Sequence, residues 1–467
     1  MNSWRLTLPE RLYQSLSEHL FRGDDEEHGA VILAGTCQSD RGLRLVAREL
    51  HLAVDGTDYI RNERGYYTLQ PHFITEKILR AQRLKLAYLT VHNHMGIDSV
   101  EFSHIDLRSH ERGYPALLDI NEDRPVGALV FAKEAIAGDL WLRGRKRSQL
   151  NHAIVVGKKR KVLSPFPRCL ILRHNELYAR QTLLFGEVGQ DILGKIRVGI
   201  VGLGGVGSIV AELLGRLGVG EFVLADPDRA EKSNLSRLIG ARKIHAFGTT
   251  SSTRYGSNWF GTTKVKLAAR NIRKAGKKNV RITMLPYDFL HDDVAAQFKD
   301  CDYIFLAADD MKARTLFNVM VHQYGIPGVQ IGVKVRTSDS GEVGDVYCVN
   351  RFITPDNGCM WCRSLIKPQR GQQNNGYVDD PDVASPSVIT LNAIAGSHAA
   401  NDFLFYTTGL KQVAQDYVEF RWHPRAYNLY LSRCKKDNKC IDCSLNDKSC
   451  LGRGDDYDLP TKPTRTL

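Results

Sequence analysis

Three glycines in the middle of the chain, Gly202, Gly204 and Gly207, follow the apolar stretch IRVGIV. This GxGxxG spacing lets backbone N–H groups approach the phosphates of a nucleotide at the start of a helix. Asp226 follows about 20 residues later, at the end of the next apolar stretch, where a carboxylate would hold ribose hydroxyls. The pattern by itself suits a dinucleotide and ATP equally.

A second group of reactive side chains lies nearer the N-terminus, in the segment TVHNHMGIDSVEFSHID. His92 and His94 alternate along an apolar stretch, so both imidazoles lie on one face of an extended chain. Asp106 follows Ser103 by about one helical turn. Two imidazoles and a carboxylate would hold zinc and leave its fourth position open to water, as catalytic zinc sites do.

Two CxxC pairs form a third group: Cys359 and Cys362, then Cys440 and Cys443. The pairs lie about 80 residues apart, which suits a tetrahedral Zn²⁺ that joins distant segments. Because all four ligands would come from the protein, the predicted role of this zinc is structural. Cys434 and Cys450 flank the second pair and could replace one of its ligands.

The residues after Asp226 distinguish between the two nucleotide interpretations. The segment DPDRAEKSNLSRL contains Asn234 and Arg237 and resembles the DxDxVxxSNLxRQ pattern of the ThiF/MoeB/HesA superfamily of adenylating enzymes, relatives of ubiquitin-activating enzymes. GTTKVKLAAR resembles the GxxKxxxA segment of that family, and AADDMKAR resembles its DxxDNxxxR strand end. The resemblance covers about residues 175–445 and assigns Lys264 and Asp309 to the site.

This resemblance implies ATP as the substrate nucleotide and Mg²⁺ as its companion, held by Asp309. YARQTLLFG resembles the RYxRQ helix of the family, which implies that Arg180 reaches a nucleotide, often across a dimer interface. Arg180, Arg237 and Lys264 would stabilise the charge that develops when a carboxylate attacks the α-phosphate. The long stretch IHAFGTTSSTRYGSNWFG before this lysine leaves Lys266 as an alternative.

The positions of the cysteines indicate whether the expected reaction includes a thioester. Related adenylating enzymes carry a structural zinc at the corresponding CxxC pairs, and ubiquitin-activating relatives usually hold a thioester-forming cysteine in the crossover segment between them. Residues 363–433 contain no cysteine. The resemblance therefore implies adenylation without a crossover-loop thioester, with Cys348, Cys434 or Cys450 as the alternative nucleophiles.

The histidine segment resembles the JAB/JAMM metalloprotease motif, in which HxH is followed by seven residues, Ser, two residues and Asp. Here eight residues separate His94 from Ser103, and Met95 replaces the usual proline. DEEHGAVILAG resembles the ExxGxLLG segment of that family, which selects Glu26 as the general base, with Glu27 beside it. Ser103 would stabilise the tetrahedral oxyanion of a peptide hydrolysis.

These patterns predict an α/β protein. We expect a JAB-like mixed α/β domain over residues 1–155 and a linker over 156–170. A Rossmann-like, doubly wound adenylating domain with a four-cysteine zinc site would follow over 171–450, because a strand, a glycine turn, a helix and a strand come in succession. Residues 451–467 should form a polar, loose tail.

Composition agrees with a folded, multidomain chain. The protein has 467 residues, of which 43% are hydrophobic and 25% charged, which excludes disordered and fibrous classes. The net charge of +12 comes from 64 basic and 52 acidic residues in short runs, and we interpret it as solvated surface without a specific nucleic-acid partner. No apolar run reaches membrane-spanning length and no signal-peptide core is present, so we expect a cytoplasmic protein.

Together the resemblances imply a zinc peptidase that cuts at the C-terminal glycine of a ubiquitin-like protein and an enzyme that adenylates the same glycine. Two alternatives remain open: activation of a sulfur-carrier protein in cofactor biosynthesis, or an inactive JAB domain that only docks the modifier. A conjugating enzyme or a sulfurtransferase would be a further partner, and analogy with relatives suggests a homodimer. The pathway could serve antiviral defence, regulation or biosynthesis.

Overall fold

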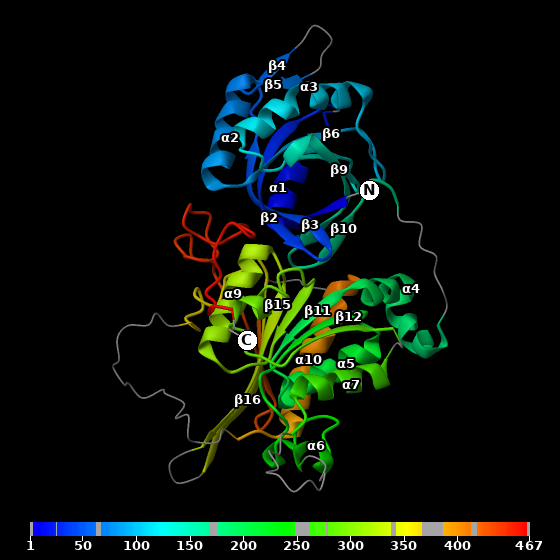
Figure 1. Ribbon diagram of the computed structural model, residues 1–467, viewed down its shortest axis with the longest axis vertical. Helices are drawn as coiled ribbons and strands as arrows, with labels where there is room; N and C mark the ends of the chain where they lie inside the picture. Colours follow the sequence, from blue (N-terminus) through cyan, green and yellow to red (C-terminus); the bar gives the residue numbers. More distant parts are fainter. Residues whose placement is uncertain are drawn as a thin grey trace, which may run out of the picture.

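Two large sheets, each of eight strands, organise the protein (Figure 1). The computed structural model describes residues 3–24, 26–61, 67–167, 175–247, 261–276, 279–337, 342–366, 386–411 and 418–464. The first sheet is built by the N-terminal part of the chain and the second by the remainder, and helices cover both.

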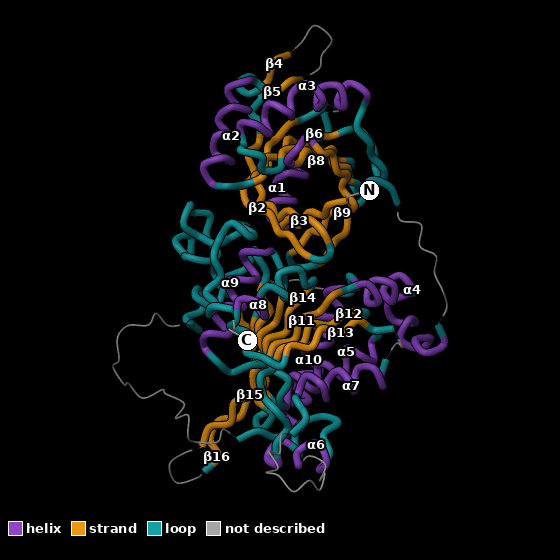
Figure 2. The backbone as a smooth tube through the Cα atoms, viewed as in Figure 1, coloured by secondary structure: helices purple, strands orange, loops and turns teal. Residues whose placement is uncertain are grey.

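The first sheet has the strand order β1-β3-β2-β6-β7-β8-β9-β10, and β1 also pairs with β9, so the strands curve into a ring (Figure 2). Its strands are β1 (Ser3–Pro9), β2 (Gly29–Ser39), β3 (Gly42–Leu52), β6 (Ala87–Asn93), β7 (Val126–Phe131), β8 (Ile136–Leu142), β9 (Lys146–Val156) and β10 (Arg160–Leu163). The apolar run of β7 is buried throughout because both faces of the sheet are covered.

Three helices complete this half of the molecule. Helix α1 (Glu10–Leu20) packs on one face of the sheet, against a cluster that includes Trp4. Helices α2 (Pro71–Leu84) and α3 (His104–Ile120) pack on the other face, around Tyr88. A small hairpin of β4 (Tyr59–Arg61) and β5 (Tyr67–Leu69) lies beside them.

The second sheet has the order β13-β12-β11-β14-β15-β16-β17-β18. The strands are parallel from β13 to β15, and the pairs from β15 to β18 are antiparallel. The strands are β11 (Arg197–Val201), β12 (Glu221–Ala225), β13 (Arg281–Leu285), β14 (Tyr303–Leu306), β15 (Gly328–Thr337), β16 (Val343–Ile353), β17 (Glu419–His423) and β18 (Asn428–Ser432). The chain runs from β11 to β12 and β13, then returns to the opposite side of β11 as β14. Such a reversal opens a ligand-binding crevice at the carboxyl ends of the strands.

Helices lie on both faces of the second sheet (Figures 1 and 2). The described helices are α4 (Ala179–Lys195), α5 (Gly205–Leu217), α6 (Lys243–Phe247), α7 (Lys264–Ala275), α8 (Asp292–Ala295), α9 (Met311–Tyr324) and α10 (Ile389–Thr408). One core joins α5, α7 and α10 to the sheet, and another joins α8 and α9. The expected α/β class and Rossmann-like order are confirmed. Within the described residues, no helix combines the length and apolarity needed to span a membrane.

Buried ion pairs join the two halves. Asp300, which is 3% exposed, accepts a hydrogen bond from Arg5 Nη2 at 2.8 Å and lies 3.2 Å from Arg44 Nε. Arg197 at the start of β11 donates to both oxygens of Asp40 in the turn after β2, at 2.8 and 2.6 Å. Asp300 and its arginines are withdrawn from water, whereas Asp40 is 70% exposed, and both ion pairs connect the two sheets.

Two segments differ from simple sequence expectations. Strand β10 lies within the stretch expected as a linker and pairs with β9. Residues 451–464, expected to be loose, instead pack between the halves: Gly35 N of β2 donates to Gly452 O at 3.1 Å, and Gly454 N donates to Gln323 O of α9 at 3.1 Å. A Cβ at Gly35 would collide with the backbone of this segment, so glycine is required there.

The Asp300 cluster yields a stability prediction. Asp300→Ala should lower the free energy of unfolding by about 3–5 kcal/mol, because it leaves two buried guanidinium groups unpaired. Urea unfolding measures the change, with Asp191→Ala as the control, since Asp191 pairs with Lys195 at the surface and should cost at most about 1 kcal/mol. Equal losses in both variants would contradict the prediction.

The Asp300 cluster also predicts how the free energy of unfolding depends on pH. Burial by itself would raise the pKa of Asp300, but Arg44 and Arg5 outweigh it and lower the pKa to about 2. A carboxyl pKa that is lower in the folded state contributes stability above the unfolded value of about 4, and the contribution disappears as the pH falls through the folded value. The stability difference between wild type and Asp300→Ala should therefore shrink between about pH 4 and pH 2.

Candidate active sites

The glycine turn after β11 is shaped by close backbone packing. Gly202 has φ +83°, a conformation that favours glycine. A Cβ at Gly207 would collide with Gly202 O, whereas a Cβ at Gly204 would meet nothing within 4 Å. Gly204 is the N-cap of α5 and brings no side chain, so the first N–H groups of the helix face open space.

A cavity of about 320 Å³ opens beside this turn, at the carboxyl ends of β11, β12 and β14. Gly202, Gly204, Asp226, Lys264 and Asp309 all line it. This crevice is the one that the strand-order reversal creates. The structure thus brings together residues that are more than a hundred positions apart in the sequence.

The carboxylate of Asp226 contacts both the glycine turn and Lys264. Its Oδ2 accepts a hydrogen bond from Leu203 N at 2.6 Å, which ties the carboxylate to the glycine turn. Burial raises the pKa of Asp226, and Lys264 opposes that shift. Lys264 Nζ lies 3.8 Å from Asp226 Oδ1 and 2.6 Å from Asp228 Oδ2. Lys266, the alternative lysine, does not line the cavity.

Two adjacent carboxylates at the end of β14 have different contacts. Asp310 accepts a hydrogen bond from Ala313 N at 2.8 Å and caps α9. Asp309 and Asp310 both line the cavity, and only Asp310 is used as the cap of α9. Carboxylates facing a phosphate-sized cavity are the ligand type that Mg²⁺ prefers, so the donor set at Asp309 fits that ion.

Three other expected residues do not line the cavity. Arg237 lies beside the start of α5, where its Cδ would be 3.5 Å from a Cβ at Gly205, and its Nη1 donates to Ser233 O at 3.0 Å. Asn234 ends the short helical turn that precedes it. Arg180 is exposed on α4, and its contact with a nucleotide stays a prediction.

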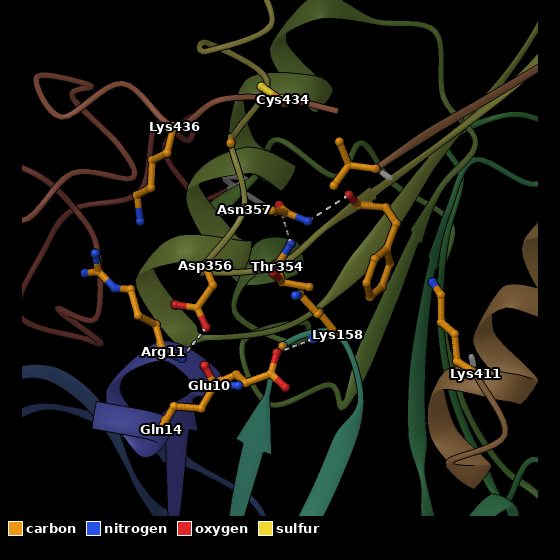
Figure 3. Close-up of a pocket in the computed structure, with 14 residues that line it drawn as sticks. Glu10, Arg11, Gln14, Lys158, Thr354, Asp356, Asn357, Lys411, Cys434 and Lys436 are labelled. Carbon is orange, nitrogen blue, oxygen red and sulfur yellow. Dashed lines mark hydrogen bonds between the residues drawn. The ribbon is translucent and has the colours of Figure 1, made fainter. Parts of the chain in front are cut away.

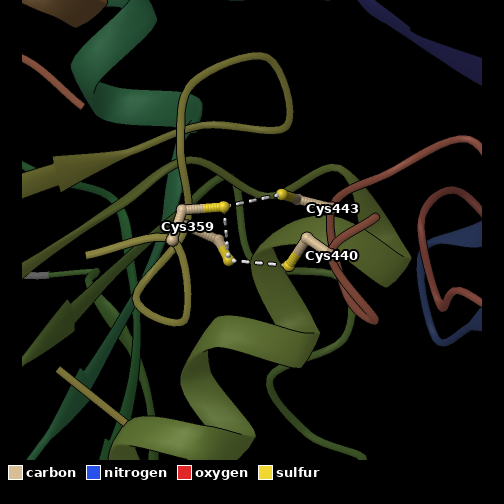
Figure 4. Close-up of side chains that lie close together, drawn as sticks. Cys359, Cys440 and Cys443 are labelled. Atoms are coloured by element: carbon tan, nitrogen blue, oxygen red, sulfur yellow. Dashed lines mark hydrogen bonds between the residues drawn. The ribbon is translucent and has the colours of Figure 1, made fainter. Parts of the chain in front are cut away.

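The four cysteines form a compact cluster (Figure 4). Cys359 Sγ lies 3.7 Å from Cys362 Sγ and 3.4 Å from Cys440 Sγ, and Cys362 Sγ lies 3.5 Å from Cys443 Sγ. Sulfurs at ~2.3 Å from a tetrahedral zinc lie about 3.8 Å apart, so the donor set fits Zn²⁺.

The other cysteines considered as thioester nucleophiles have different environments. Cys348 is buried, donates to Leu391 O at 3.3 Å, and burial raises its pKa to about 11. Cys450 is buried, and burial raises its pKa as well. A thiol that stays protonated is a weak nucleophile. Cys434 is partly exposed at the edge of another cavity.

The predicted histidine site is also assembled. His92 Nε2 and His94 Nε2 lie 3.2 Å apart, and Asp106 Oδ2 lies 3.6 and 3.4 Å from them. The hydrogen bond with Asp106 raises the pKa of His94. Ser103 caps α3 and donates from Oγ to Asp106 Oδ2 at 2.7 Å. Three ligand atoms converge on one point, which fits a zinc ion with an open position.

The carboxylate facing this cluster is Glu27, the neighbour of the predicted general base Glu26. Glu27 Oε1 lies 3.8 Å from His94 Nε2, and Glu27 lines a cavity of about 500 Å³ together with the three ligands. Glu26 does not line it, and its backbone carbonyl accepts from Asn93 Nδ2 at 3.3 Å. Adjacent residues of an extended segment face opposite ways, so only one of the two reaches the metal ligands.

The second sheet is doubly wound, and the glycine turn, Asp226 and Lys264 lie where its strand order reverses. This arrangement is typical of nucleotide-binding α/β domains. The chain belongs to the ThiF family, which matches residues 178–445. The family match begins after the histidine site, so the resemblance of the N-terminal residues to the JAB/JAMM motif stays a prediction.

Ubiquitin-like modifier-activating enzyme 5 is a similar protein in several animals. The Drosophila grimshawi enzyme is 24% identical over 284 residues, covering 58% of this chain and 63% of that protein. The Caenorhabditis elegans enzyme is 25% identical over 273 residues, covering 56% and 57%. The chain thus spans about three fifths of these relatives. A crystal structure of E. coli MccB with ATP is 17% identical and covers 59% and 76%, with a TM-score of 0.44.

The glycine turn provides a matched pair of variants. Gly207→Ala forces a Cβ against Gly202 O and should lower stability by about 1–3 kcal/mol. Gly204→Ala has open space and should leave thermal unfolding nearly unchanged. Calorimetry of both variants checks this difference, and a Gly207→Ala protein as stable as Gly204→Ala would refute the packing assignment.

The two metal-fitting clusters predict metal content. Wild type should hold about two zinc ions per chain, and His94→Ala and Cys443→Ser should each hold about one. Elemental analysis of the purified proteins measures this, with His152→Ala, at an exposed ring, as the control. One zinc in both wild type and His94→Ala would exclude a filled histidine site.

Proposed function

We propose that this protein activates a ubiquitin-like protein by ATP-dependent adenylation of its C-terminal glycine. The observation that carries the proposal is a single cavity that gathers the glycine turn, Asp226, Lys264 and Asp309 in a chain of the ThiF family. The similarity to enzymes named as activating ubiquitin-like modifiers supports this substrate class.

In the proposed reaction, a carboxylate oxygen of the modifier attacks the α-phosphate of ATP, and diphosphate leaves. The free N–H groups at the start of α5 would bind phosphate oxygens, and Asp226 would accept hydrogen bonds from the ribose. Lys264 would oppose the negative charge that grows in the transition state. Mg²⁺ at Asp309, when bound, would supply further charge neutralisation.

Arg237 and Arg180 have supporting roles in this proposal. Arg237 lies next to the start of α5 and would turn its guanidinium toward the phosphates bound there. Arg180, exposed on α4, would complete the site of a second copy in a homodimer. The four-cysteine cluster would hold a structural Zn²⁺ and needs no part in the chemistry, because all four positions are filled by sulfur.

We further propose that the N-terminal half is a metallopeptidase acting on the same modifier. The supporting observation is the convergence of His92, His94 and Asp106 beside Glu27, in a cavity large enough for a peptide segment. Zinc at the three ligands would supply Lewis-acid activation of water and of the scissile carbonyl. Glu27 would take the proton from the water and give it to the leaving amine.

The two proposed activities form a sequence. The peptidase would expose the C-terminal glycine or release the modifier from its target, and the adenylating site would then activate that glycine for a conjugating enzyme. A sulfur-carrier protein offers the same terminal carboxylate, with a sulfurtransferase as the acceptor. The identity of the protein that stimulates adenylation discriminates between these two pathways.

Adenylation is tested by exchange of labelled diphosphate into ATP, with a ubiquitin-like protein or a sulfur carrier as the second substrate. Lys264→Ala and Asp309→Ala should each lower the exchange rate by about 100-fold or more, because each removes charge stabilisation at the phosphates. Lys195→Ala, which alters an exposed pair, is the matched control. Exchange at wild-type rates in the two site variants would refute the assignment.

Peptidase activity is tested on modifier fusions with a C-terminal extension. Glu27→Gln should lower the cleavage rate by at least about 100-fold, because the amide cannot act as a base. Glu26→Gln, one residue away, should retain cleavage, and both variants should keep the zinc content of wild type. Loss of cleavage in Glu26→Gln alone would reverse the assignment, and a zinc-loaded wild type that cleaves nothing would favour a docking role.

A further inference from the structure

A third cavity, of about 260 Å³, lies between the two halves of the molecule (Figure 3). The first residues of α1 and the turn between β9 and β10 form one wall. The loop after β16, the residue Lys411 and the segment after β18 form the other walls. This cavity shares no lining residue with the glycine-turn cavity or the histidine cavity.

Cationic side chains predominate in this cavity. Its lining includes four cations and two carboxylates: Arg11, Lys158, Lys411, Lys436, Glu10 and Asp356. Both carboxylates are bound by backbone groups, since Glu10 Oε2 accepts from Lys158 N at 2.7 Å and Asp356 Oδ2 accepts from Arg11 N at 2.9 Å. The lining thus holds two more cationic than anionic side chains.

The lysines from the second half of the molecule have weak partners. Lys436 Nζ donates to Pro355 O at 3.2 Å and makes no ion pair with any residue that the structure describes. Lys411 Nζ lies 4.1 Å from the centre of the Phe352 ring and 3.9 Å from Asp402 Oδ1, and burial lowers its pKa. A partly buried ammonium with no carboxylate within hydrogen-bond distance gains stability when an anion binds.

The cations also lie on different sides of the cavity. Figure 3 shows Lys436 and Arg11 at one end and Lys411 at the other, with Lys158 between them. A diphosphate carries negative charge at both of its ends, which matches cations on opposite sides of a cavity. The small volume favours a compact ligand over a protein or nucleic-acid segment.

We propose that this interdomain cavity binds the diphosphate group of a small ligand, either inorganic diphosphate or the diphosphate of a nucleotide. Lys411 and Lys436 hold it from the second half of the molecule, and Arg11 and Lys158 hold it from the first. The bound ligand therefore bridges the two halves. This proposal does not depend on the adenylation chemistry.

Calorimetric titration with inorganic diphosphate and with ADP tests the proposal. A Lys264→Gln background weakens binding at the glycine-turn cavity, so that the remaining binding reports the interdomain cavity. Adding Lys411→Gln and Lys436→Gln to that background should weaken diphosphate binding at least tenfold, while adding Lys411→Arg and Lys436→Arg should preserve it. Lys146→Gln, at an exposed position, is the control for removal of a positive charge.

Two further measurements distinguish a nucleotide from free diphosphate and show whether each variant is folded. Tighter binding of ADP than of inorganic diphosphate identifies a nucleotide, and the reverse identifies the free ion. Lys158→Glu, in an exposed turn, should also weaken binding tenfold without altering a buried group. Thermal unfolding of each variant, with and without diphosphate, shows whether it is folded and whether the ligand stabilises it.

The proposal is overturned if diphosphate binding disappears with Lys264→Gln alone, or if it is unchanged by the Lys411→Gln, Lys436→Gln and Lys158→Glu substitutions. Labelled-diphosphate exchange into ATP should persist in Lys411→Gln/Lys436→Gln, which keeps the adenylation site intact. Failure of the exchange assay in wild type would count against the proposed adenylation and would leave the binding result unaffected.

Discussion

The adenylation proposed for this protein depends on where the second sheet reverses its strand order. Because β12 and β14 leave β11 on opposite sides, their carboxyl ends separate and open a crevice directly over the glycine turn. The backbone of that turn approaches itself so closely that Gly207 tolerates no side chain. Asp226, bonded to Leu203 N, then connects the turn to the next strand. The geometry of every candidate catalytic group in this half follows from these backbone constraints.

The relation between the two halves depends on a different kind of interaction. Arginines from the first sheet surround Asp300 of the second, where water is excluded, and residues 451–464 add backbone hydrogen bonds to β2 and α9. Buried pairs of this kind add little net stability but are costly to break singly, so they specify one arrangement. A fixed arrangement is what allows cations from both halves to line a common cavity.

Sequence reasoning succeeded where a local motif coincides with a topological rule. The glycine spacing and Asp226 required only a strand, a turn and a helix, and Lys264 and Asp309 followed from family resemblance. The choice between Glu26 and Glu27 rested on the motif alone, because adjacent glutamates before β2 differ only in the direction of the side chain, and Glu27 is the one that lies near His94. The interdomain cavity could not be predicted from the sequence, because Arg11, Lys158 and Lys411 come from segments with no common pattern. The packing of residues 451–464 was missed because polar, glycine-containing sequence resembles a free tail.

The contact between Gly452 and Gly35 also bears on how the chain acquires its structure during synthesis. The ring of β1 to β10 can close as soon as β9 has been made, because β1 pairs directly with β9. The acceptor for Gly35 N is translated more than four hundred residues later, after both sheets. The hydrogen bonds from residues 451–464 to β2 and α9 can therefore form only near the end of synthesis. A translation product that stops before Gly452 lacks the acceptor for Gly35 N.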